Sequence, residues 1–489
     1  MEEETNSNQR HLRIAIFGAG ASGLLAAIKL REMGLEDLTI FEKAGDLGGT
    51  WRENRYPGLS CDVPSHAYRY SFAPNPEWSH MCSPGHEIQA YLKDIAERYE
   101  LENIIKYNNE VIRANFADGK WHLESVEGSQ GSFDAVITAT GLLHHPVYPD
   151  IPGLDDFDGP MFHTARWDDA ATLEGKRVGI IGAGSTSVQI TSAIVDQVSK
   201  LSIFQRTAQW IFPLPNTPIS EEQKQSYRDD PLLMQEEYDR ISHENNTKFA
   251  AAVVGENPRA YQKLFALCQE NLECVRDPEL RAKLTPDYEM GCKRLVMSDT
   301  FYEAIQHTNA ELVTDDIELI EAGGIRTKDG RLHELDVLVL ATGFDTHKPL
   351  GSMTVTGPDN YTLEEAWSQG NQGYMTTSVP GFPNWFMIGG PNSPIGNFSW
   401  LLTAETQFAY IAQLIEKLHI DGVATIVPTA KAATDFNNAV QAKIPDTIWA
   451  TGCSSWYLDK HGRVGSWPWT FDEFQSKLSK PKWGDFELV

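Results

Sequence analysis

The chain has 489 residues, of which 68 are acidic and 41 basic, and its net charge of −27 disfavours nucleic acids and anionic membrane surfaces as partners. A chain of this length exceeds what one hydrophobic core serves and predicts two or three domains. No apolar run in it is long enough to predict a membrane-spanning helix, so we expect no membrane insertion.

The first residues and the cysteines predict a cytoplasmic protein. Residues 1–5 are acidic and polar, unlike a secretory signal or a transit peptide. The six cysteines are scattered without a CxxC pair, which is typical of a reducing compartment and predicts neither a disulfide framework nor a zinc site. The histidines and the acidic pairs also lack metal-ligand spacing, so we expect no bound metal.

The first predicted unit, residues 12–42, has the order strand, turn, helix, strand. An apolar run ends at Phe17, and a glycine-rich turn then leads into a helix-like stretch. Here the glycines let the backbone approach a pyrophosphate, and the helix N-terminus offers it free N–H groups. The second strand ends at Glu42, an acceptor suited to ribose hydroxyls. The candidate dinucleotide residues of this unit are Gly18, Gly20, Ser22, Gly23, Glu42 and Lys43.

A strand is predicted over 134–140, and a segment rich in proline, glycine and aspartate then predicts a linker. The second unit, about 175–207, repeats the first, with a strand-like run over 177–181 before its own glycine-rich turn. At the position equivalent to Glu42 it carries Arg206, which suits a 2′-phosphate and favours NADP over NAD. Ser187 stands where a third glycine is usual, which puts the affinity for NADPH in doubt. The candidate residues are Gly182, Gly184, Ser185, Thr186, Ser187, Gln189, Arg206 and Thr207.

The remaining elements indicate an α/β fold of two Rossmann-like dinucleotide-binding domains. Residues 1–150 form the first part of one domain and 151–174 the linker. Residues 175–344 form the second domain, with a charge-rich helical insertion at about 213–290 and a buried strand near 337–343. Residues 345–489 complete the first domain and the C-terminal region, with a short strand over 385–389 and an amphipathic helix over 404–418.

Two long sequence patterns accompany the glycine-rich turns. Phe157, Gly159, His163 and Trp167 satisfy FxGxxxHxxxW, and residues 48–62 satisfy [A/G]GxWxxxx[F/Y]P[G/M]xxxD in full. Together they resemble the type I Baeyer–Villiger monooxygenases, and the resemblance continues through residues 291–294, 380–384 and 390–394 to 455–457. It covers nearly the whole chain. Members of that family use FAD, NADPH and dioxygen to convert ketones into esters or lactones.

The resemblance implies a catalytic pair. By motif match, Arg294 is the fixed cation that stabilises a flavin peroxide anion and the tetrahedral adduct that this anion forms with the ketone. An arginine keeps its proton, and its planar guanidinium group can contact two oxygen atoms at once. Asp62 matches the carboxylate that orients this arginine.

The resemblance also implies FAD in the first site and NADPH in the second. Lys293 joins Arg206 on the 2′-phosphate, and Trp456 helps to bind the nicotinamide when a mobile loop closes. His163 and Trp167 couple domain movement to the NADP site rather than act as acid or base. Further residues of the flavin site are Gly49, Thr50, Trp51, Tyr56, Asp62 and Tyr68. For the large aromatic side chains, packing in the core is the alternative role.

Two other function classes stay open. A flavin monooxygenase that oxidises nitrogen or sulfur centres is the main alternative, although those relatives carry Phe or Tyr in place of Trp167 and lack the Lys-Arg motif. A redox-sensing or NADPH-binding protein without turnover is the second. Flavin disulfide reductases are excluded because they need a close cysteine pair beside the first turn. We expect a ketone and dioxygen as substrates, and a monomer or weak oligomer.

Overall fold

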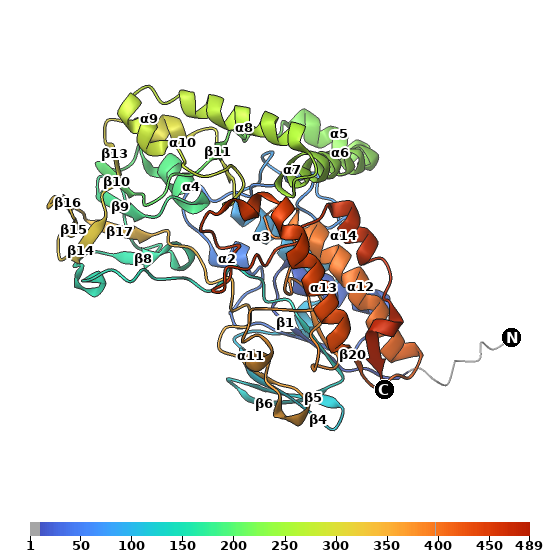
Figure 1. Ribbon diagram of the computed structural model, residues 1–489. Helices are drawn as coiled ribbons and strands as arrows, with labels where there is room; N and C mark the ends of the chain where they lie inside the picture. The colour runs from blue at the N-terminus through green and yellow to red at the C-terminus, as the bar shows by residue number, and fades with distance from the viewer. Residues whose placement is uncertain (1–9, 397) are drawn as a thin grey trace.

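The computed structural model describes residues 10–396 and 398–489, and one of its two large sheets carries the first glycine-rich turn (Figure 1). Five parallel strands lie in the order β19-β7-β1-β2-β3. Their bounds are β1 Ile14–Phe17, β2 Leu38–Phe41, β3 Ile105–Lys106, β7 Ala135–Thr138 and β19 Trp385–Met387. β1 and β7 are buried along their whole length, as expected for a parallel sheet covered on both faces.

The second large sheet carries the second turn and has the strand order β13-β10-β9-β17-β8. All of its pairings are parallel as well. Its strands are β8 Met161–His163, β9 Arg177–Ile181, β10 Lys200–Phe204, β13 Ala310–Val313 and β17 Val337–Leu340. These two parallel sheets confirm the predicted fold class.

The segment predicted as a linker is more ordered than that prediction allowed. Its strand β8 forms the edge of the second sheet, where Met161 pairs with Leu338 and His163 with Leu340. The high content of proline, glycine and aspartate around this stretch concealed a short extended run whose residues Phe162 and His163 are buried. The linker interpretation was therefore wrong for these three residues.

Helices pack against both sheets and between them. Helix α12, Trp400–Ile420, lies against α1, Ala21–Glu32, which follows the first turn. Leu24, Leu25, Phe408 and Ile411 belong to the buried core between the sheet and these helices. The other helices outside the insertion are α2 Thr50–Glu53, α3 Gly85–Arg98, α4 Ser185–Ile194, α10 Phe301–Ala304, α11 Leu363–Ala366, α13 Ala430–Lys443 and α14 Phe471–Lys477.

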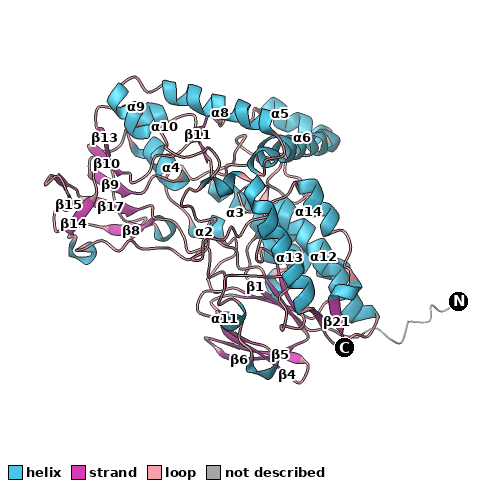
Figure 2. Cartoon of the chain, in the orientation of Figure 1, coloured by secondary structure: helices cyan, strands magenta, loops and turns pink. Residues whose placement is uncertain are grey.

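A layer of helices lies between β11, Ile211–Phe212, and β12, Val296–Met297, which pair with each other as a separate two-stranded sheet (Figures 1 and 2). Several of these helices begin at a side-chain cap, for example Ser220 for α5 and Asp230 for α6. Such caps satisfy the free N–H groups of a helix start. The helices of the layer are α5 Glu221–Asp229, α6 Pro231–Glu244, α7 Ala251–Val253, α8 Pro258–Glu273 and α9 Pro278–Leu284.

Besides the pair β11-β12, three small sheets complete the described part of the fold. Strands β18, Thr354–Thr356, β4, Val111–Ala117, β5, Lys120–Ser125, and β6, Gly128–Phe133, form one, in that order. A second is β14 Ile317–Glu321, β15 Gly324–Thr327 and β16 Leu332–Glu334, and the third pairs β20 Ile426–Pro428 with β21 Phe486–Leu488. Within residues 10–396 and 398–489, no helix has the length and apolar character needed to cross a membrane.

Candidate cofactor and active site

The first glycine-rich turn brings three backbone segments into close contact. Gly18 has a φ of 101°, and a Cβ there would lie 2.7 Å from the carbonyl oxygen of Ala139, so no other residue fits easily. A Cβ on Gly23 would lie only 1.8 Å from the carbonyl oxygen of Gly18. Helix α1 then begins after Gly20 without a side-chain cap and without an acidic residue in its first turn. Its free N-terminus therefore suits an anion such as a pyrophosphate.

Glu42 is buried at the end of β2 and braces the loops around this turn. Its Oε2 accepts a hydrogen bond from the amide of Ala19 at 2.8 Å, and its Oε1 accepts one from the amide of Ala44 at 2.9 Å. A carboxylate has about four acceptor positions, so these bonds leave capacity for ribose hydroxyls. Lys43 follows and contacts the Nδ1 atom of His144 at 3.0 Å.

A cavity of about 1260 Å³ is lined in part by Lys43, the residue that follows Glu42. Its walls carry both cations and carboxylates, and the carboxylates are Asp46, Glu110, Asp345 and the buried Glu53. The lining cations are Lys43, Arg52, Arg55, Arg166 and Lys348. Because Lys43 directly follows Glu42, this cavity lies next to the predicted ribose acceptor.

The residues predicted around the flavin lie where the first turn meets helix α2. A Cβ on Gly49 would approach the Cα of Gly20 to 3.2 Å, so the two loops are in backbone contact. Trp51, in α2, packs edge-on against Tyr68 and donates a hydrogen bond to its hydroxyl at 3.3 Å. Thr50 accepts hydrogen bonds from the side chain of Asn54. The predicted contact of Ser22 is occupied, because its buried hydroxyl accepts a hydrogen bond from Trp400.

One predicted flavin residue connects the two sites. The Tyr56 hydroxyl donates a hydrogen bond to Oε1 of Gln189, which lies in α4, at 2.9 Å. A Cβ on Gly58 would lie 2.6 Å from the carbonyl oxygen of Gln189, so this loop touches the helix directly. Burial raises the pKa of Tyr56 to about 12, against a lowering effect of a hydrogen bond with Thr186. Tyr56 is therefore a neutral hydrogen-bond donor between the sites.

The second turn repeats the first with one difference. Gly182 has a φ of 125°, and a Cβ there would lie 2.3 Å from the carbonyl oxygen of Ala341. The contact is equivalent to that between Gly18 and the carbonyl oxygen of Ala139. A Cβ on Gly184 would meet no described protein atom within 4 Å, and α4 begins at Ser185 without a side-chain cap. Ser187 is fully buried and fits where the first copy needs a glycine. The open space at Gly184 is what a pyrophosphate requires.

Two predicted cations lie near each other beyond this turn. Arg206 is exposed after β10, with Thr207 half-buried beside it, and neither Arg206 nor Lys293 forms an ion pair within the described residues. Burial and the charge of Arg206 lower the pKa of Lys293. The ammonium of Lys293 donates a hydrogen bond to the carbonyl oxygen of Ser454 at 2.6 Å and lies over the ring of Tyr288. Two neighbouring cations, neither with an ion-pair partner among the described residues, favour a dianion such as a 2′-phosphate.

The predicted catalytic pair forms an ion pair between distant parts of the chain. Nη2 of Arg294 lies 2.5 Å from Oδ2 of Asp62, and both side chains are partly exposed, to 30% and 24%. The charge of Asp62 outweighs burial and raises the pKa of Arg294 above its ordinary value. The guanidinium is therefore a permanent cation, oriented from one side and open on the other.

Trp456 and Tyr457 lie beside this cation. Their rings stack with centroids 4.2 Å apart, and a Cβ on Gly396 would lie 2.5 Å from the Tyr457 hydroxyl and 2.9 Å from Nη1 of Arg294. Burial raises the pKa of Tyr457 to about 12, so it is a neutral phenol. Both aromatic residues line a cavity of about 720 Å³ that also touches Leu142. Tyr457 was missed as a site residue, although it directly follows Trp456 in the sequence.

The signature histidine has a structural environment. His163 is completely buried, its Nδ1 accepts from the amide of Ala165, and its Nε2 bonds the carbonyl oxygen of Gly343 at 3.1 Å. Burial lowers its pKa, so it is neutral and donates to Gly343. Trp167 packs edge-on against Phe162 in the same core.

The other signature residues support the same segment. A Cβ on Gly159 would lie 2.5 Å from the carbonyl oxygen of Asp336 and 2.8 Å from the ring of Phe157. His163 holds the turn after β17, and that turn includes Ala341, which covers Gly182. The signature residues therefore support the loop after β17, which packs against Gly182 in the second glycine-rich turn.

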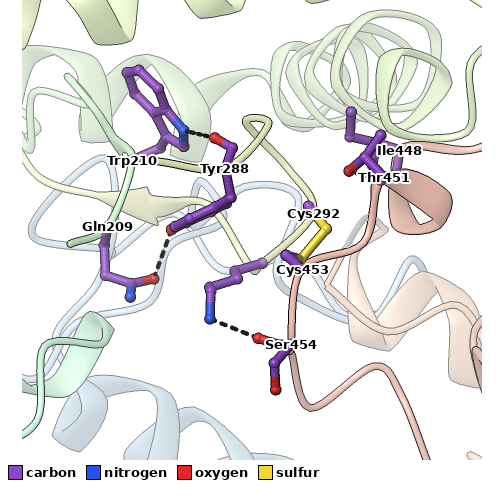
Figure 3. The surroundings of a disulfide bond; sticks show 9 residues. Gln209, Trp210, Tyr288, Cys292, Ile448, Thr451, Cys453 and Ser454 are labelled. Carbon is purple, nitrogen blue, oxygen red and sulfur yellow. Dashed lines mark hydrogen bonds between the residues drawn. A yellow bond between two sulfur atoms is a disulfide. The ribbon is translucent and has the colours of Figure 1, made fainter. Parts of the chain in front are cut away.

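The expectation that the cysteines form no disulfide was wrong for one pair. Cys292 and Cys453 are bonded, 161 residues apart in sequence (Figure 3). Sequence spacing gave no signal, because only the folded chain brings these two segments together. Cys61, Cys82, Cys268 and Cys274 are free thiols.

The comparisons with known proteins agree with this geometry. A model of the family described as "Flavin-binding monooxygenase-like" matches residues 11–356. An uncharacterised monooxygenase of Mycobacterium tuberculosis is 46% identical over 97% of this chain and 96% of its own length. A Baeyer–Villiger monooxygenase of Streptomyces coelicolor is 37% identical over 98% of this chain and 93% of its own length.

Solved structures resemble the whole chain. A cyclohexanone monooxygenase of Rhodococcus sp. Phi1 bound to NADP⁺ superposes with a TM-score of 0.86 at 28% identity, covering 98% of this chain and 99% of that one. A steroid monooxygenase bound to NADP reaches 0.87 at 30% identity, with the same coverage. With two dinucleotide turns, the Arg294–Asp62 pair and relatives along its full length, the chain belongs to the flavin-binding monooxygenase-like family, and within it to the Baeyer–Villiger monooxygenases.

Proposed function

We propose that this protein is an FAD- and NADPH-dependent Baeyer–Villiger monooxygenase that inserts one oxygen atom of dioxygen beside the carbonyl of a ketone. The ion pair of Arg294 and Asp62 is the observation that carries the proposal. It gives the site a permanent cation beside the cavity at Trp456. Relatives named Baeyer–Villiger monooxygenase, and similar structures with FAD and NADP, support the same reaction.

The residues present fit both cofactors. The uncapped start of α1 and the acceptor Glu42 suit FAD, while the open space at Gly184 and the cations Arg206 and Lys293 suit NADPH. When bound, NADPH would supply the reducing equivalents and FAD would activate dioxygen. We assign the predicted roles of these residues on that basis.

The chain's own residues act on charge and orientation. Negative charge develops on the carbonyl oxygen of a ketone when its carbon is attacked, and a preorganised cation stabilises that charge most strongly where water is excluded. Arg294 supplies this cation, and Asp62 holds its fork in place. The buried hydroxyl of Tyr457 adds a neutral group beside it.

A product assay tests the proposal. The purified yellow protein, NADPH and air are mixed with linear, cyclic and aryl ketones and one thioether, and esters, lactones, sulfoxide and hydrogen peroxide are followed together. Ester or lactone from any ketone supports the proposal. Sulfoxide alone, with every ketone untouched and NADPH use well coupled, would move the assignment to a heteroatom monooxygenase.

A variant connects the activity to the site. Arg294→Ala keeps FAD and its reduction by NADPH, but loses ester formation by orders of magnitude. Arg259→Ala changes an exposed arginine of α8 that is not among the proposed site residues, so it serves as the control and keeps full activity. Retained ester formation in Arg294→Ala would overturn the role of this arginine.

The broader setting is part of the same proposal. We retain the division into a first dinucleotide domain of residues 1–150 and 345–489 and a second of 175–344. A cytoplasmic location gives access to NADPH; four of the six cysteines are free thiols, whereas Cys292 and Cys453 form a disulfide of the kind that is rare in a reducing compartment. A monomer or weak oligomer is proposed as well, and light scattering of the purified protein would measure it directly.

A further inference from the structure

The Cys292–Cys453 disulfide joins two segments that both carry proposed site residues (Figure 3). Cys292 directly precedes Lys293 and Arg294. Cys453 directly precedes Ser454, whose carbonyl oxygen accepts the hydrogen bond from Lys293, and lies three residues before Trp456. The covalent bond therefore ties the proposed 2′-phosphate cation to the segment of residues 452–457.

Residues 452–455 have few contacts outside their own stretch, whereas Tyr457 belongs to a buried apolar cluster with Val253 and Trp449, against which Trp456 packs. The whole segment lies between the helical turn that ends at Thr451 and the helix α14, without a regular helix or strand of its own. The carbonyl oxygens of Ser455 and Tyr457 accept backbone hydrogen bonds from the amides of Leu458 and Gly465, within the same stretch. Apart from ring packing, the described contacts that anchor residues 452–457 elsewhere are the disulfide, the Lys293 bond and a weak bond from Thr346 to the carbonyl oxygen of Trp456.

The segment around Cys292, at the other end of the disulfide, is firmly held. Cys292 is completely buried, and the neighbouring Tyr288 accepts a hydrogen bond from Trp210 on its carbonyl oxygen and donates one from its hydroxyl to Gln209 (Figure 3). Cys453 is only half-buried, and Ser454 is exposed. The disulfide thus connects the buried Cys292 to the more exposed N-terminal part of a segment that Tyr457 anchors at its other end, and a reductant can approach it from the Cys453 side.

We propose that the Cys292–Cys453 disulfide positions residues 452–457 against Lys293 and Arg294, and that its reduction releases this segment and weakens the NADP site. The proposal rests on the proposed function for its biological meaning. A released segment withdraws the Ser454 carbonyl from Lys293, which must then be ordered when the 2′-phosphate binds. Ordering one such side chain lowers affinity by roughly 2- to 10-fold.

The chemistry is a thiol–disulfide exchange with a dithiol such as dithiothreitol. One thiolate of the dithiol attacks a sulfur, the bond between Cys292 and Cys453 breaks, and both become thiols. The dithiol closes to its cyclic disulfide and gives up two electrons and two protons. In a reducing cytoplasm such bonds are typically redox-responsive rather than permanent.

The test uses the full-length protein with FAD bound. Denatured protein should show four thiols before treatment with dithiothreitol and six after treatment in the native state. The reduced protein and the variant Cys292→Ser/Cys453→Ser should both exchange the amide hydrogens of residues 452–466 faster and bind NADP⁺ roughly 2- to 10-fold more weakly. The variant should no longer respond to dithiothreitol.

Cys274→Ser is the matched control, because Cys274 is an exposed free thiol on a remote helix end, and it should respond to the reductant like the unaltered chain. Should the double variant fail to fold, reduction of the folded wild type still provides the comparison. Six thiols without reductant, or unchanged hydrogen exchange and NADP⁺ affinity after reduction to six thiols, would overturn the proposal.

These measurements do not depend on turnover. Faster exchange and weaker NADP⁺ binding on reduction, without ester from any ketone, would support the disulfide's role while removing the proposed reaction. Ester formation, together with hydrogen exchange and NADP⁺ affinity that do not change on reduction, would support the proposed reaction and overturn the role of the disulfide.

Discussion

Replacing Arg206 should change which coenzyme the protein prefers without changing its stability. Arg206 is exposed and forms no ion pair among the residues that the structure describes, so Arg206→Ala breaks no ion pair in the free protein and removes only a repulsion with Lys293. Its free energy of unfolding should change by less than about 0.5 kcal/mol. The whole effect should therefore fall on the binding of the 2′-phosphate.

The size of that effect follows from the kind of contact. A hydrogen bond to a charged group contributes about 1.5–3 kcal/mol, which corresponds to roughly 10- to 150-fold in affinity. Because Arg206 is exposed and screened by solvent, we expect the lower part of this range, about 10- to 30-fold. NADH lacks the 2′-phosphate, so its use should not change.

The assay compares kcat/KM for NADPH and for NADH with one ketone at a fixed concentration, together with the Kd of NADP⁺ and NAD⁺. Arg259→Ala provides a control with an equally exposed arginine. A parallel loss with both coenzymes would mean that Arg206 acts on folding or on the shared part of the dinucleotide. No loss with NADPH would refute its assignment to the 2′-phosphate.

Three further substitutions test the site. Gly184→Ala adds a methyl group where no described protein atom lies within 4 Å, so thermal stability should hold while NADP⁺ binding weakens; unchanged binding would show that no pyrophosphate lies there. Gly23→Ala places a Cβ 1.8 Å from the carbonyl oxygen of Gly18, so FAD content and the free energy of unfolding should fall, the latter by about 1–3 kcal/mol, and full FAD content would contradict this. Asp62→Asn removes the charge that orients Arg294, so ester formation should fall by about 10- to 100-fold while NADPH still reduces the flavin. Slower flavin reduction with unchanged oxygen transfer would mean that Asp62 acts in the reduction step instead.

Features encoded within about thirty residues were predictable from the sequence. The strand, glycine-rich turn and helix of each unit are local, and the positions of Glu42 and Arg206 follow from the same short unit. The strand expected over 134–140 is β7, Ala135–Thr138, and the helix expected over 404–418 is α12, Trp400–Ile420. Local backbone preference and apolar periodicity determine these elements directly.

Contacts between distant segments were not predictable in this way. Asp62 and Arg294 are 232 residues apart, and only the resemblance to a family suggested that they meet. Cys292 and Cys453 carry no spacing signal at all, and their pairing depends on how the segment after Thr451 packs against the loop at Lys293. The strand β8 was missed because its composition resembles a linker, while its pairing with β17 is decided by the sheet.

The pH dependence of NADPH binding connects the two cations of the second site. Burial and the charge of Arg206 lower the pKa of Lys293, so its ammonium loses its proton at a lower pH than an ordinary lysine. The 2′-phosphate needs that proton, and NADPH affinity should therefore fall as the pH rises through this lowered pKa, with partial proton uptake on binding just above it. NADH should show no such fall. Arg206→Ala removes the repulsion and should move the inflection to higher pH, a shift that titration of NADP⁺ affinity against pH would measure. An inflection in the same place for both proteins would mean that Arg206 does not act on Lys293, and that the two cations do not share one phosphate.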